Sequence, residues 1–416
     1  MWLVSLSNKF KHDFTLRKRD FIIAAFIVIN TYSWFFPLYI LLENITLQRA
    51  SEYTQVIMLF GFFYILAFFS PFIGVFMINK KFLKRSTLFL LWTGIGSVTS
   101  MLLSFNFSGW NLNYMMISFS FLGISLGLGF PSCLSYFADL NTIENRGRNA
   151  GLIFLIVGPT ILILGVIDQL LPTFVSFVFL AMWRFSCFVT LVTFKIKEVS
   201  IGTVIPSYKQ IIVERKFTTY FIPWTMFCIV NYFEASLLKN FFGPEFSLLI
   251  PLIELGVAGV IASIGGYLSD FVGRKRVVIF GFAMLGIGYA FLGLFPYSVT
   301  SWYSYITADG IAWGIFAVMF FFLLWGELAG NQQKEKYYLL GELPFLIVSY
   351  IAMVVKPYLT AIHVSSAFSL ASLFLFLAVI PLLFAPETLP ERELKERELR
   401  NYIEKAKRIR EKFTKG

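Results

Sequence analysis

Twelve long apolar runs dominate this sequence and restrict what it can fold into. Each run has about 20 mostly apolar residues, the length that a helix needs to cross the hydrocarbon core of a bilayer. Of the 416 residues, 57% are hydrophobic and only 14% are charged, more apolar side chain than a water-soluble core can bury. The sequence therefore predicts an all-α polytopic membrane protein with twelve transmembrane helices at 21–42, 54–78, 87–106, 112–137, 150–171, 174–194, 218–240, 246–268, 277–295, 301–325, 339–361 and 364–385.

The basic residues are distributed very unevenly between the two sides of these predicted spans. With the N-terminus inside, 31 of the 35 Lys and Arg residues fall in inner segments, and only Arg49 falls in an outer loop. Positive residues collect in cytoplasmic loops, so we expect a multi-pass protein of the cell membrane with both termini cytoplasmic. The net charge of +11 then faces the anionic inner lipid surface, and no nucleic-acid partner is needed to explain it.

No pattern typical of an enzyme, a metal protein or an ATP-driven pump is present in the sequence. The cysteines Cys133, Cys187 and Cys228 lie inside apolar runs, and the two histidines are isolated, so no metal site is predicted. No phosphate-binding loop of the form G-x-x-x-x-G-K-[ST] occurs. We expect no enzymatic activity and no cofactor, and the expected partners of a monomer are the lipid bilayer and a small-molecule solute.

The longest inner connection divides the chain into two halves of six spans. It runs over 195–217 and separates an N-terminal half, 1–194, from a C-terminal half, 218–385. A charged tail follows over 386–416, and its periodic apolar residues are typical either of an amphipathic helix on the inner membrane surface or of a solvated tail. The sequence thus predicts two six-helix halves, a cytoplasmic linker and a cytoplasmic tail.

Two features recur between these halves. The glycine-to-arginine stretch 74–85, after the second span, has a counterpart at 266–276, after the eighth, at an offset of 192. An acid followed seven residues later by a base occurs at Asp139 and again at Glu327, at an offset of 188. Two independent recurrences at nearly the same offset indicate a six-plus-six internal repeat.

The loop between the eighth and ninth spans has a pattern with a known parallel. Residues 266–276 read Gly-Tyr-Leu-Ser-Asp-Phe-Val-Gly-Arg-Lys-Arg, which matches G-x-L-x-D-x-x-G-R-K at every defining position. This pattern resembles the cytoplasmic-loop signature of the major facilitator superfamily of secondary transporters. The resemblance implies two six-helix halves that carry a solute by alternating access, driven by a proton gradient. The alternative is an ordinary positive-inside turn of another membrane protein.

Further segments resemble the sugar porter branch of this superfamily. They are the glycines and proline of 123–131 with Asp139 and 146–148, then Trp-Gly-Glu-Leu at 325–328, and Pro-Glu-Thr at 386–388. This resemblance implies a symporter that takes up a sugar, a carboxylate or a similar metabolite. The seventh span lacks the paired glutamines with which sugar porters hold hexose hydroxyls.

Two other functions are the alternatives to uptake. Gly158-Pro159 partly resembles a motif of proton-driven exporters, so one alternative is export of amphipathic compounds or drugs. The alternative of another class is a non-transporting membrane sensor, which a long soluble output domain would favour.

The first-half copy of the loop signature departs from the pattern. Ile78 stands where the aspartate belongs, and Phe82 and Leu83 replace the Arg-Lys pair. After the tenth span, Lys334 replaces the usual arginine and Glu335 the usual glycine. We therefore expect that the first half has no contact equivalent to the one that Asp270 makes in the second half.

A cytoplasmic gate is predicted at the inner helix ends. Asp270 and Arg274 lie four residues apart in a tight turn, and the family resemblance brings Glu327 beside them. Such a cluster would join the inner ends when the cavity faces outward and would break when it opens inward. The residues assigned to the gate are Asp270, Arg274, Lys275, Glu327, Asp139, Arg146 and Arg148. The alternative is that the loop only sets the topology, for which its basic residues suffice.

Polar and aromatic side chains inside the spans predict a solute site near the middle of the membrane. Each of them alone is equally consistent with helix packing, so the hypothesis concerns the set. The residues are Asn30, Tyr32 and Trp34 of the first span, Asn231 and Tyr232 of the seventh, and Trp313 of the tenth.

Charged residues inside spans are costly and mark functional positions. The candidates are Glu234, Glu254, Asp309 and Lys356, all in the second half. One interpretation is that one acid carries a proton, and the other is a buried ion pair such as Glu254 with Lys356. Arg184 lies nearer the middle of the membrane, where it serves packing or contacts the substrate. Asp168 and Glu43 lie near outer span ends and are expected to be solvated.

The charge bias gives a direct test of the twelve-span topology. A tag inserted at Ser108 should be reachable only from outside the cell, and a tag at Ile205 only from inside, because an odd number of spans separates them. Antibody labelling of intact and permeabilised cells measures this. Labelling of both tags on the same side would contradict the twelve-span arrangement.

Overall fold

The computed structural model describes the backbone of residues 2–105, 110–198, 204–359 and 362–389. Within these ranges it describes the side chains except those of 2–17, 236 and 239–253. The predicted amphipathic tail beyond residue 389 lies outside the described residues. The described chain is almost entirely helical, with one isolated bridge between Val204 and Gln332.

The first half consists of seven helical segments that form six crossings. They are α1 (Trp2–Arg49), α2 (Tyr53–Asn79), α3 (Arg85–Phe105), α4 (Leu112–Gly127), α5 (Phe130–Leu140), α6 (Arg146–Leu170) and α7 (Thr173–Thr193). Within the linker, the short helix α8 (Tyr208–Val213) begins at a capping box formed by Ser207 and Gln210.

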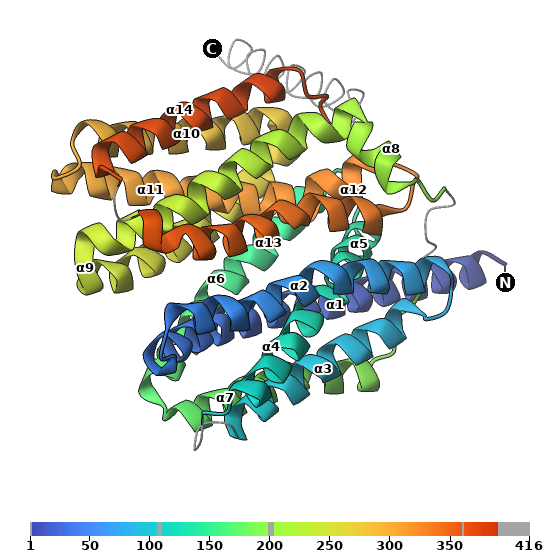
Figure 1. Ribbon diagram of the computed structural model, residues 1–416. Helices are drawn as coiled ribbons and strands as arrows, with labels where there is room; N and C mark the ends of the chain where they lie inside the picture. The colour runs from blue at the N-terminus through green and yellow to red at the C-terminus, as the bar shows by residue number, and fades with distance from the viewer. Residues whose placement is uncertain (1, 106–109, 199–203, 360–361, 390–416) are drawn as a thin grey trace, which may run out of the picture.

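The second half repeats this plan, except that its first two crossings belong to one continuous element, α9 (Arg215–Val272). Its other segments are α10 (Arg274–Leu294), α11 (Val299–Phe316), the π-helix η1 (Ala317–Leu323), α12 (Leu324–Leu328), α13 (Lys334–Leu359) and α14 (Val364–Leu383). In Figure 1 the helices α1 to α7 form one group and α9 to α14 the other.

The long element α9 crosses the bundle twice. Near its start, the Tyr220 hydroxyl donates to the Pro386 carbonyl at 2.7 Å, and just past its end the Arg274 N–H donates to the Glu387 carboxylate at 2.7 Å. Its two ends therefore lie side by side, and Figure 1 shows the reversal between them. In the described part of the chain, eleven segments are long and apolar enough to cross a membrane, and the first arm of α9 adds the twelfth crossing. The predicted all-α fold of twelve transmembrane helices is confirmed.

The two halves meet along a few helices. α6 of the first half packs against α9, and α13 of the second half packs against α2. α6 and α9 approach closely because both carry glycines at the contact. A Cβ atom on Gly266 would lie 2.2 Å from the Gly147 carbonyl oxygen, and one on Gly151 would lie 2.5 Å from the Ala262 carbonyl oxygen.

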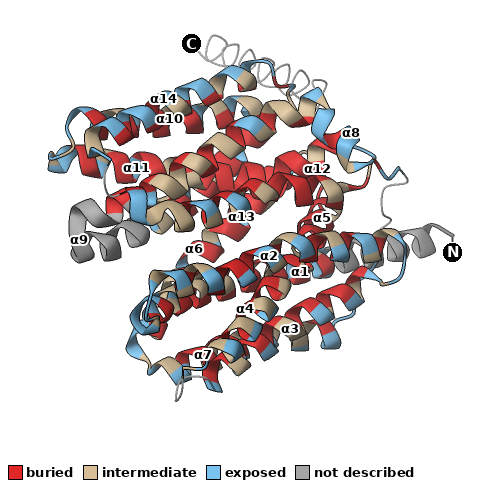
Figure 2. Ribbon diagram, viewed as in Figure 1, coloured by how far each residue is buried: buried red, intermediate tan, exposed pale blue. Residues whose placement is uncertain are grey.

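The fourth and tenth predicted spans are both irregular, at equivalent places. The break between α4 and α5 falls at Leu128–Gly129, with Pro131 in the first turn of α5. η1 begins at Ala317, 188 residues after Gly129, the offset by which Asp139 and Glu327 recur. All seven residues of η1 are buried, and Figure 2 shows this buried region at the centre of the bundle. Single-turn π segments inside helices are frequent at functional sites.

The perimeter of the bundle carries exposed apolar side chains. Met182 of α7, Phe280 of α10 and Leu370 of α14 are each more than half exposed. Apolar side chains in this position are what a helix presents to lipid. The protein is therefore a multi-pass membrane protein.

Close glycine contacts inside the first half predict a large packing effect. A Cβ atom on Gly123 of α4 would lie 2.2 Å from the Phe63 carbonyl oxygen of α2, whereas a Cβ atom on Gly165 of α6 would meet nothing within 4 Å. We expect Gly123→Ala to lower the free energy of unfolding by about 1–3 kcal/mol through overpacking. Gly165→Ala should be neutral or raise it by up to about 1 kcal/mol. Thermal unfolding in detergent measures both, and equal stability of the two variants would contradict this packing.

Candidate functional site

One end of the bundle is held together by charged side chains. We call it the basic end, defined by the loops 80–84, 141–145 and 329–333 and by Gly273 between α9 and α10. Its first group is the Arg274 cluster, made of Asp270, Arg274, Glu327 and Arg146. Arg274 Nη1 donates to Asp270 Oδ1 at 2.7 Å, and its Nη2 donates to Glu327 Oε1 at 3.2 Å. Arg146 Nη1 lies 3.7 Å from Glu327 Oε1, so an arginine of the first half joins the cluster of the second half.

Asp270 connects the two halves through the start of a helix. Its carboxylate accepts hydrogen bonds from the backbone N–H groups of Gly147 at 3.1 Å and Arg148 at 2.9 Å, in the first turn of α6. The N-terminus of a helix carries partial positive charge and unpaired N–H donors, so it binds a carboxylate well. Arg274 Nη2 adds a hydrogen bond to the Ile143 carbonyl of the first half at 2.7 Å. Asp270 and Arg274 are fully buried.

The end of the described chain also binds this cluster. The Glu387 carboxylate accepts hydrogen bonds from the N–H groups of Arg274 at 2.7 Å and Lys275 at 3.2 Å, at the start of α10. Gly273 has φ +105°, and a Cβ atom there would lie 2.5 Å from that carboxylate, so only glycine fits. The Lys275 side chain lies outside the Arg274 cluster, since its Nζ donates to the Leu383 carbonyl.

A second group, the Arg85 cluster, lies where the start of α3, the end of α5 and the start of α13 meet. It consists of Arg85, Asp139, Lys334 and Glu335. Arg85 Nη1 donates to Asp139 Oδ2 at 2.8 Å and Arg85 Nε donates to Glu335 Oε1 at 3.0 Å, while Lys334 pairs with Asp139. Because α3 begins at Arg85 and α10 begins at Arg274, these two arginines are equivalent in the repeat.

The acid in this second cluster comes from an unexpected helix. Ile78 leaves α2 without the carboxylate that Asp270 supplies on α9, so the contact of the Asp270 kind is missing from the first half. Glu335 lies 188 residues after Gly147, the residue whose N–H group Asp270 binds. In the Arg274 cluster the acid Asp270 lies at the end of α9, and in the Arg85 cluster the acid Glu335 lies at the start of α13. Both junctions therefore hold a buried arginine between acids, and in both an ion pair joins the two halves.

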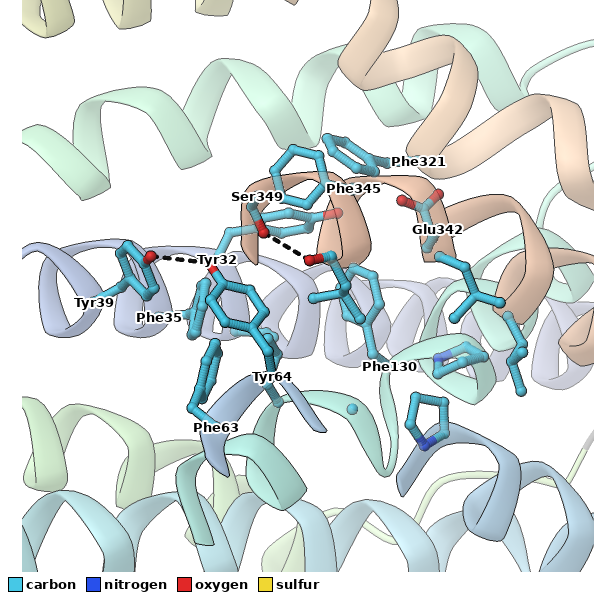
Figure 3. A pocket seen from close by; sticks show the side chains of 18 of the residues that line it. Tyr32, Phe35, Tyr39, Phe63, Tyr64, Phe130, Phe321, Glu342, Phe345 and Ser349 are labelled. Atoms are coloured by element: carbon cyan, nitrogen blue, oxygen red, sulfur yellow. Dashed lines mark hydrogen bonds between the residues drawn. The ribbon is translucent and has the colours of Figure 1, made fainter. Parts of the chain in front are cut away.

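A central cavity of about 270 Å³ lies between the halves. Residues of α1, α2, α4, α5, α9, η1 and α13 contribute to its walls, and ten of the 20 lining residues are aromatic (Figure 3). Several polar groups on the wall already have partners: Tyr39 and Tyr64 share a hydrogen bond of 2.9 Å, and Ser349 donates to the Leu346 carbonyl at 2.9 Å. The buried Tyr32 hydroxyl has no partner among the described residues. Among the described lining residues, Glu342 is the one acid or base.

Glu342 was not among the predicted site residues. It lies in α13, is only 6% exposed, and accepts a hydrogen bond from Trp325 Nε1 at 3.1 Å. The predicted span 339–361 contains Glu342 close to its inner end, where acidic residues are typically solvated. Because α13 begins at Lys334, Glu342 lies more than two turns inside the helix.

Two of the six predicted substrate residues line this cavity, namely Tyr32 and Tyr232. Asn30 lies away from it and donates to the Trp183 carbonyl at 2.7 Å. The other three take part in helix contacts. Trp34 donates to Ser100 at 2.9 Å, and Trp313 donates to Asn231 at 3.2 Å.

Arg184 has a packing environment in α7. Its side chain is fully buried, and Nη1 donates to Asn30 Oδ1 at 3.0 Å and to Thr31 Oγ1 at 2.9 Å. The guanidinium lies between the rings of Trp34 and Trp92, at 4.7 and 4.6 Å from their centroids. These cation–π contacts compensate in part for the lack of a carboxylate partner for Arg184 among the described residues. Since Thr31 lines the cavity, Arg184 positions one part of its wall.

The predicted intramembrane charges occupy three separate places. Glu254 of α9 and Asp309 of α11 lie close enough for their carboxyl groups to interact, and two such acids side by side favour a proton on one of them. Lys356 lies 3.9 Å from Glu43, so it pairs with this acid of α1 instead of Glu254. Glu234 is buried, and its Oε2 has no partner among the described residues.

The expectation for Asp168 was wrong. Asp168 is only 8% exposed, and neither carboxylate oxygen has a partner among the described residues. Its backbone carbonyl accepts a hydrogen bond from Ser176 at the start of α7. The helix end is thus covered by the neighbouring helix, which the position of Asp168 in the sequence did not reveal.

The geometry of the Arg274 cluster predicts the effect of Asp270→Asn. The amide keeps the size of the side chain but weakens its bonds to Arg274 and to the start of α6, which are worth about 1.5–3 kcal/mol each when one group is charged. We expect a roughly five- to 150-fold population shift toward the conformation open at the basic end, and a strong loss of transport at near-normal expression. Cysteine labelling at the basic end and transport in vesicles measure these effects.

A matched control is Glu144→Gln, which neutralises an acid in a loop of the basic end outside both clusters. It should label and transport as the wild type does. Wild-type labelling and transport by the Asp270→Asn protein would refute the assignment of this cluster as a gate.

Comparison with known proteins gives a clear result for the fold. No model of a protein family matches the sequence, and no curated protein matches it. Solved structures do match in three dimensions. The human organic anion transporter MFSD10 (TETRAN) has a TM-score of 0.70 at 14% identity, covering 88% of this chain and 99% of that chain.

Two further matches are sugar transporters. The proton:xylose symporter XylE, bound to 6-bromo-6-deoxy-D-glucose, has a TM-score of 0.69 at 14% identity, covering 90% of this chain and 97% of that chain. The E. coli fucose:proton symporter FucP, in the outward conformation, has a TM-score of 0.70 at 11% identity, covering 88% and 98%. At such identities the likeness concerns the fold, and the chain has the twelve-helix fold of the major facilitator superfamily.

Proposed function

We propose that this protein is a secondary transporter that carries a small organic solute across the cell membrane by alternating access. The observation that carries this proposal is a central cavity walled by both halves, together with buried ion pairs that join the halves at the basic end. The pair that joins them away from this end, Glu43 with Lys356, is longer and partly exposed. Buried ion pairs contribute little net stability, but they can bias one of two conformations if they form in only that one. A rigid scaffold would not need them at a junction between two halves.

The orientation follows from the charge bias. We propose that the basic end is cytoplasmic, with both termini inside the cell. The described conformation is then closed toward the cytoplasm by the Arg274 and Arg85 clusters. A similar neighbour, FucP, was solved in an outward conformation, and closure of the inner end is what such a state requires.

The chemistry of the cavity bears on the class of solute. A sugar or carboxylate taken up by a proton symporter is what the sequence resemblance implies. A hexose needs hydrogen-bonding partners for each hydroxyl, yet Tyr39, Tyr64 and Ser349 already bond within the wall. The Tyr32 hydroxyl, which has no partner among the described residues, offers one such group. The aromatic lining instead favours the second candidate, proton-driven export of amphipathic compounds.

A screen of the purified protein distinguishes these possibilities. Thermal unfolding is measured with sugars, carboxylates, amino acids and amphipathic compounds, since a bound solute raises the unfolding temperature. Solutes that stabilise the protein are then tested for counterflow in liposomes. Absence of transport for every solute class, together with unchanging labelling at both ends, would contradict a transporter and favour a sensor.

The intramembrane acids give a test of proton coupling. We propose that Glu254, with Asp309, or Glu234 carries the proton, because an acid held between helices can exchange a proton as the halves move. In the coupling variant, Glu254→Gln or Glu234→Gln, proton-driven accumulation should fall at least tenfold while counterflow persists. Liposomes with an imposed pH gradient measure both.

Glu52→Gln is the control, because Glu52 is exposed and accepts a hydrogen bond only from the neighbouring Thr54 in the described part of the chain. It should accumulate solute normally. If the Glu254 and Glu234 variants both accumulate solute as the wild type does, these acids are not the coupling site.

A further inference from the structure

We propose that the solute is an organic cation with an apolar body and that Glu342 is its charge partner in the central cavity. The inference rests on the proposed function and names the substrate class of the same cavity. It follows from the charge, the aromatic lining and the position of this one carboxylate.

The Glu342 carboxylate is poised for a ligand. Its Oε1 accepts the hydrogen bond from Trp325 Nε1 at 3.1 Å, and no donor among the described residues reaches Oε2. The side chain lies on the cavity wall opposite the rings of α1 and α2 (Figure 3). One oxygen therefore fixes the orientation of the carboxylate, and the other is left for a bound molecule.

No cation of the protein neutralises this carboxylate in the described part of the chain. The titratable groups that face it are Tyr32 of α1, Cys228 and Tyr232 of α9, and Tyr338 of α13. Tyrosine and cysteine are neutral at pH 7. The other elements packed against α13 supply Tyr53 and Tyr64 of α2, Cys133, Tyr136 and Asp139 of α5, Tyr208 and Lys209 of α8, and Glu327 of α12. Asp139 is held by Arg85 and Lys334, and Glu327 is held by Arg274.

A carboxylate without a counter-ion in such a site is costly when charged. It is relieved by a proton or by a positively charged ligand. A solute cation in the cavity would supply the missing partner for Oε2, whereas an anionic solute would be repelled.

The aromatic walls favour the same class of ligand. Phe35 and Phe63 stack with their centroids 6.1 Å apart, and Tyr232 and Phe345 lie edge to face at 5.2 Å. Aromatic faces carry partial negative charge and attract ammonium groups, most strongly where water is excluded. A cage of rings with one acid is the recognition chemistry of a substituted ammonium ion.

The cavity also sets the size and the mode of contact. Its volume of about 270 Å³ is near the lower limit of roughly 300–1,000 Å³ for typical ligand sites, so a compact solute fits. Glu342, Tyr232 and Phe345 belong to the second half, and Tyr32 and Phe63 to the first. A bound cation therefore touches both halves.

Proton and solute compete for the same carboxylate. When the cation binds, the proton of a neutral Glu342 leaves to the solution, and when the cation leaves, a proton replaces it, so charge in the cavity balances at each step. This competition at Glu342 couples cation movement in one direction to proton movement in the other, whichever of Glu254 and Glu234 also carries a proton. It favours exchange, and therefore export, over proton symport.

The test uses a permanent cation, so that only the protein titrates. Benzyltrimethylammonium and its uncharged carbon isostere, neopentylbenzene, are titrated by calorimetry into the full-length protein in lipid nanodiscs between pH 5 and pH 8. We expect the cation to bind at least tenfold more tightly than the isostere. Its Kd should rise as pH falls, by up to about tenfold per pH unit, because one proton is displaced per cation bound.

Three variants assign this behaviour to Glu342. Glu342→Gln keeps an oxygen that can accept the Trp325 hydrogen bond and removes only the charge, so a structural role alone would survive it. We expect it to weaken cation binding at pH 8 at least tenfold and to abolish the pH dependence. Glu342→Asp should retain the pH dependence. Asp168→Asn, which neutralises another buried acid away from the cavity, should bind as the wild type does.

Two outcomes would overturn the inference. One is a Glu342→Gln protein with wild-type affinity and pH dependence, and the other is a wild-type protein that prefers the neutral isostere or an anion. If a sugar or carboxylate is transported while the cation does not bind, the cation assignment fails and the proposed transporter function stands. If no solute of any class is bound or transported, the proposed function itself fails.

Discussion

The contact between a carboxylate and the start of a helix is the interaction on which the described arrangement depends. Asp270 of α9 binds the first N–H groups of α6, and this is possible only because Gly147 and Gly266 let the two helices approach without side chains between them. The same carboxylate holds Arg274, which in turn holds Glu327 and the Ile143 carbonyl. Helix packing, helix dipole and ion pair therefore act at one place, and separation of the halves at the basic end must break all three.

The two junctions of the repeat reach the same balance of charge by different routes. Arg85 and Arg274 both begin a helix, and each meets an acid near the end of a later helix, Asp139 of α5 or Glu327 of α12. The remaining acid is Asp270 in one case and Glu335 in the other, on opposite sides of the contact. Both halves of the repeat thus neutralise a buried arginine, but with an acid at a different position of the sequence. This is possible because charge compensation depends on distance and burial and not on which helix carries the carboxylate.

The sequence predicted the fold well, because the length of an apolar run and the side on which basic residues lie are one-dimensional properties. It also identified Asp270, Arg274 and Glu327 as neighbours, since a loop motif places residues at helix ends. It missed Glu342 because depth in a cavity depends on how α13, η1 and the break before α5 meet. It offered Lys356 as a partner for Glu254, whereas Glu254 meets Asp309 and Lys356 meets Glu43, since the rotation of each helix decides which side chains face one another.

The cavity and the basic end share one short helix. Trp325 of α12 donates to Glu342 on the cavity wall, and two residues later Glu327 binds Arg274. The π-helix η1 runs directly into α12, and it is the least regular part of a bundle that is otherwise built from long α-helices. A ligand shifts a conformational equilibrium only through contacts that differ between the states. A cation that binds Oε2 of Glu342 changes the charge of the carboxyl group to which Trp325 donates. Its effect therefore begins on α12, the helix that carries Glu327, so solute binding can influence the ion pairs of the basic end through this one short helix.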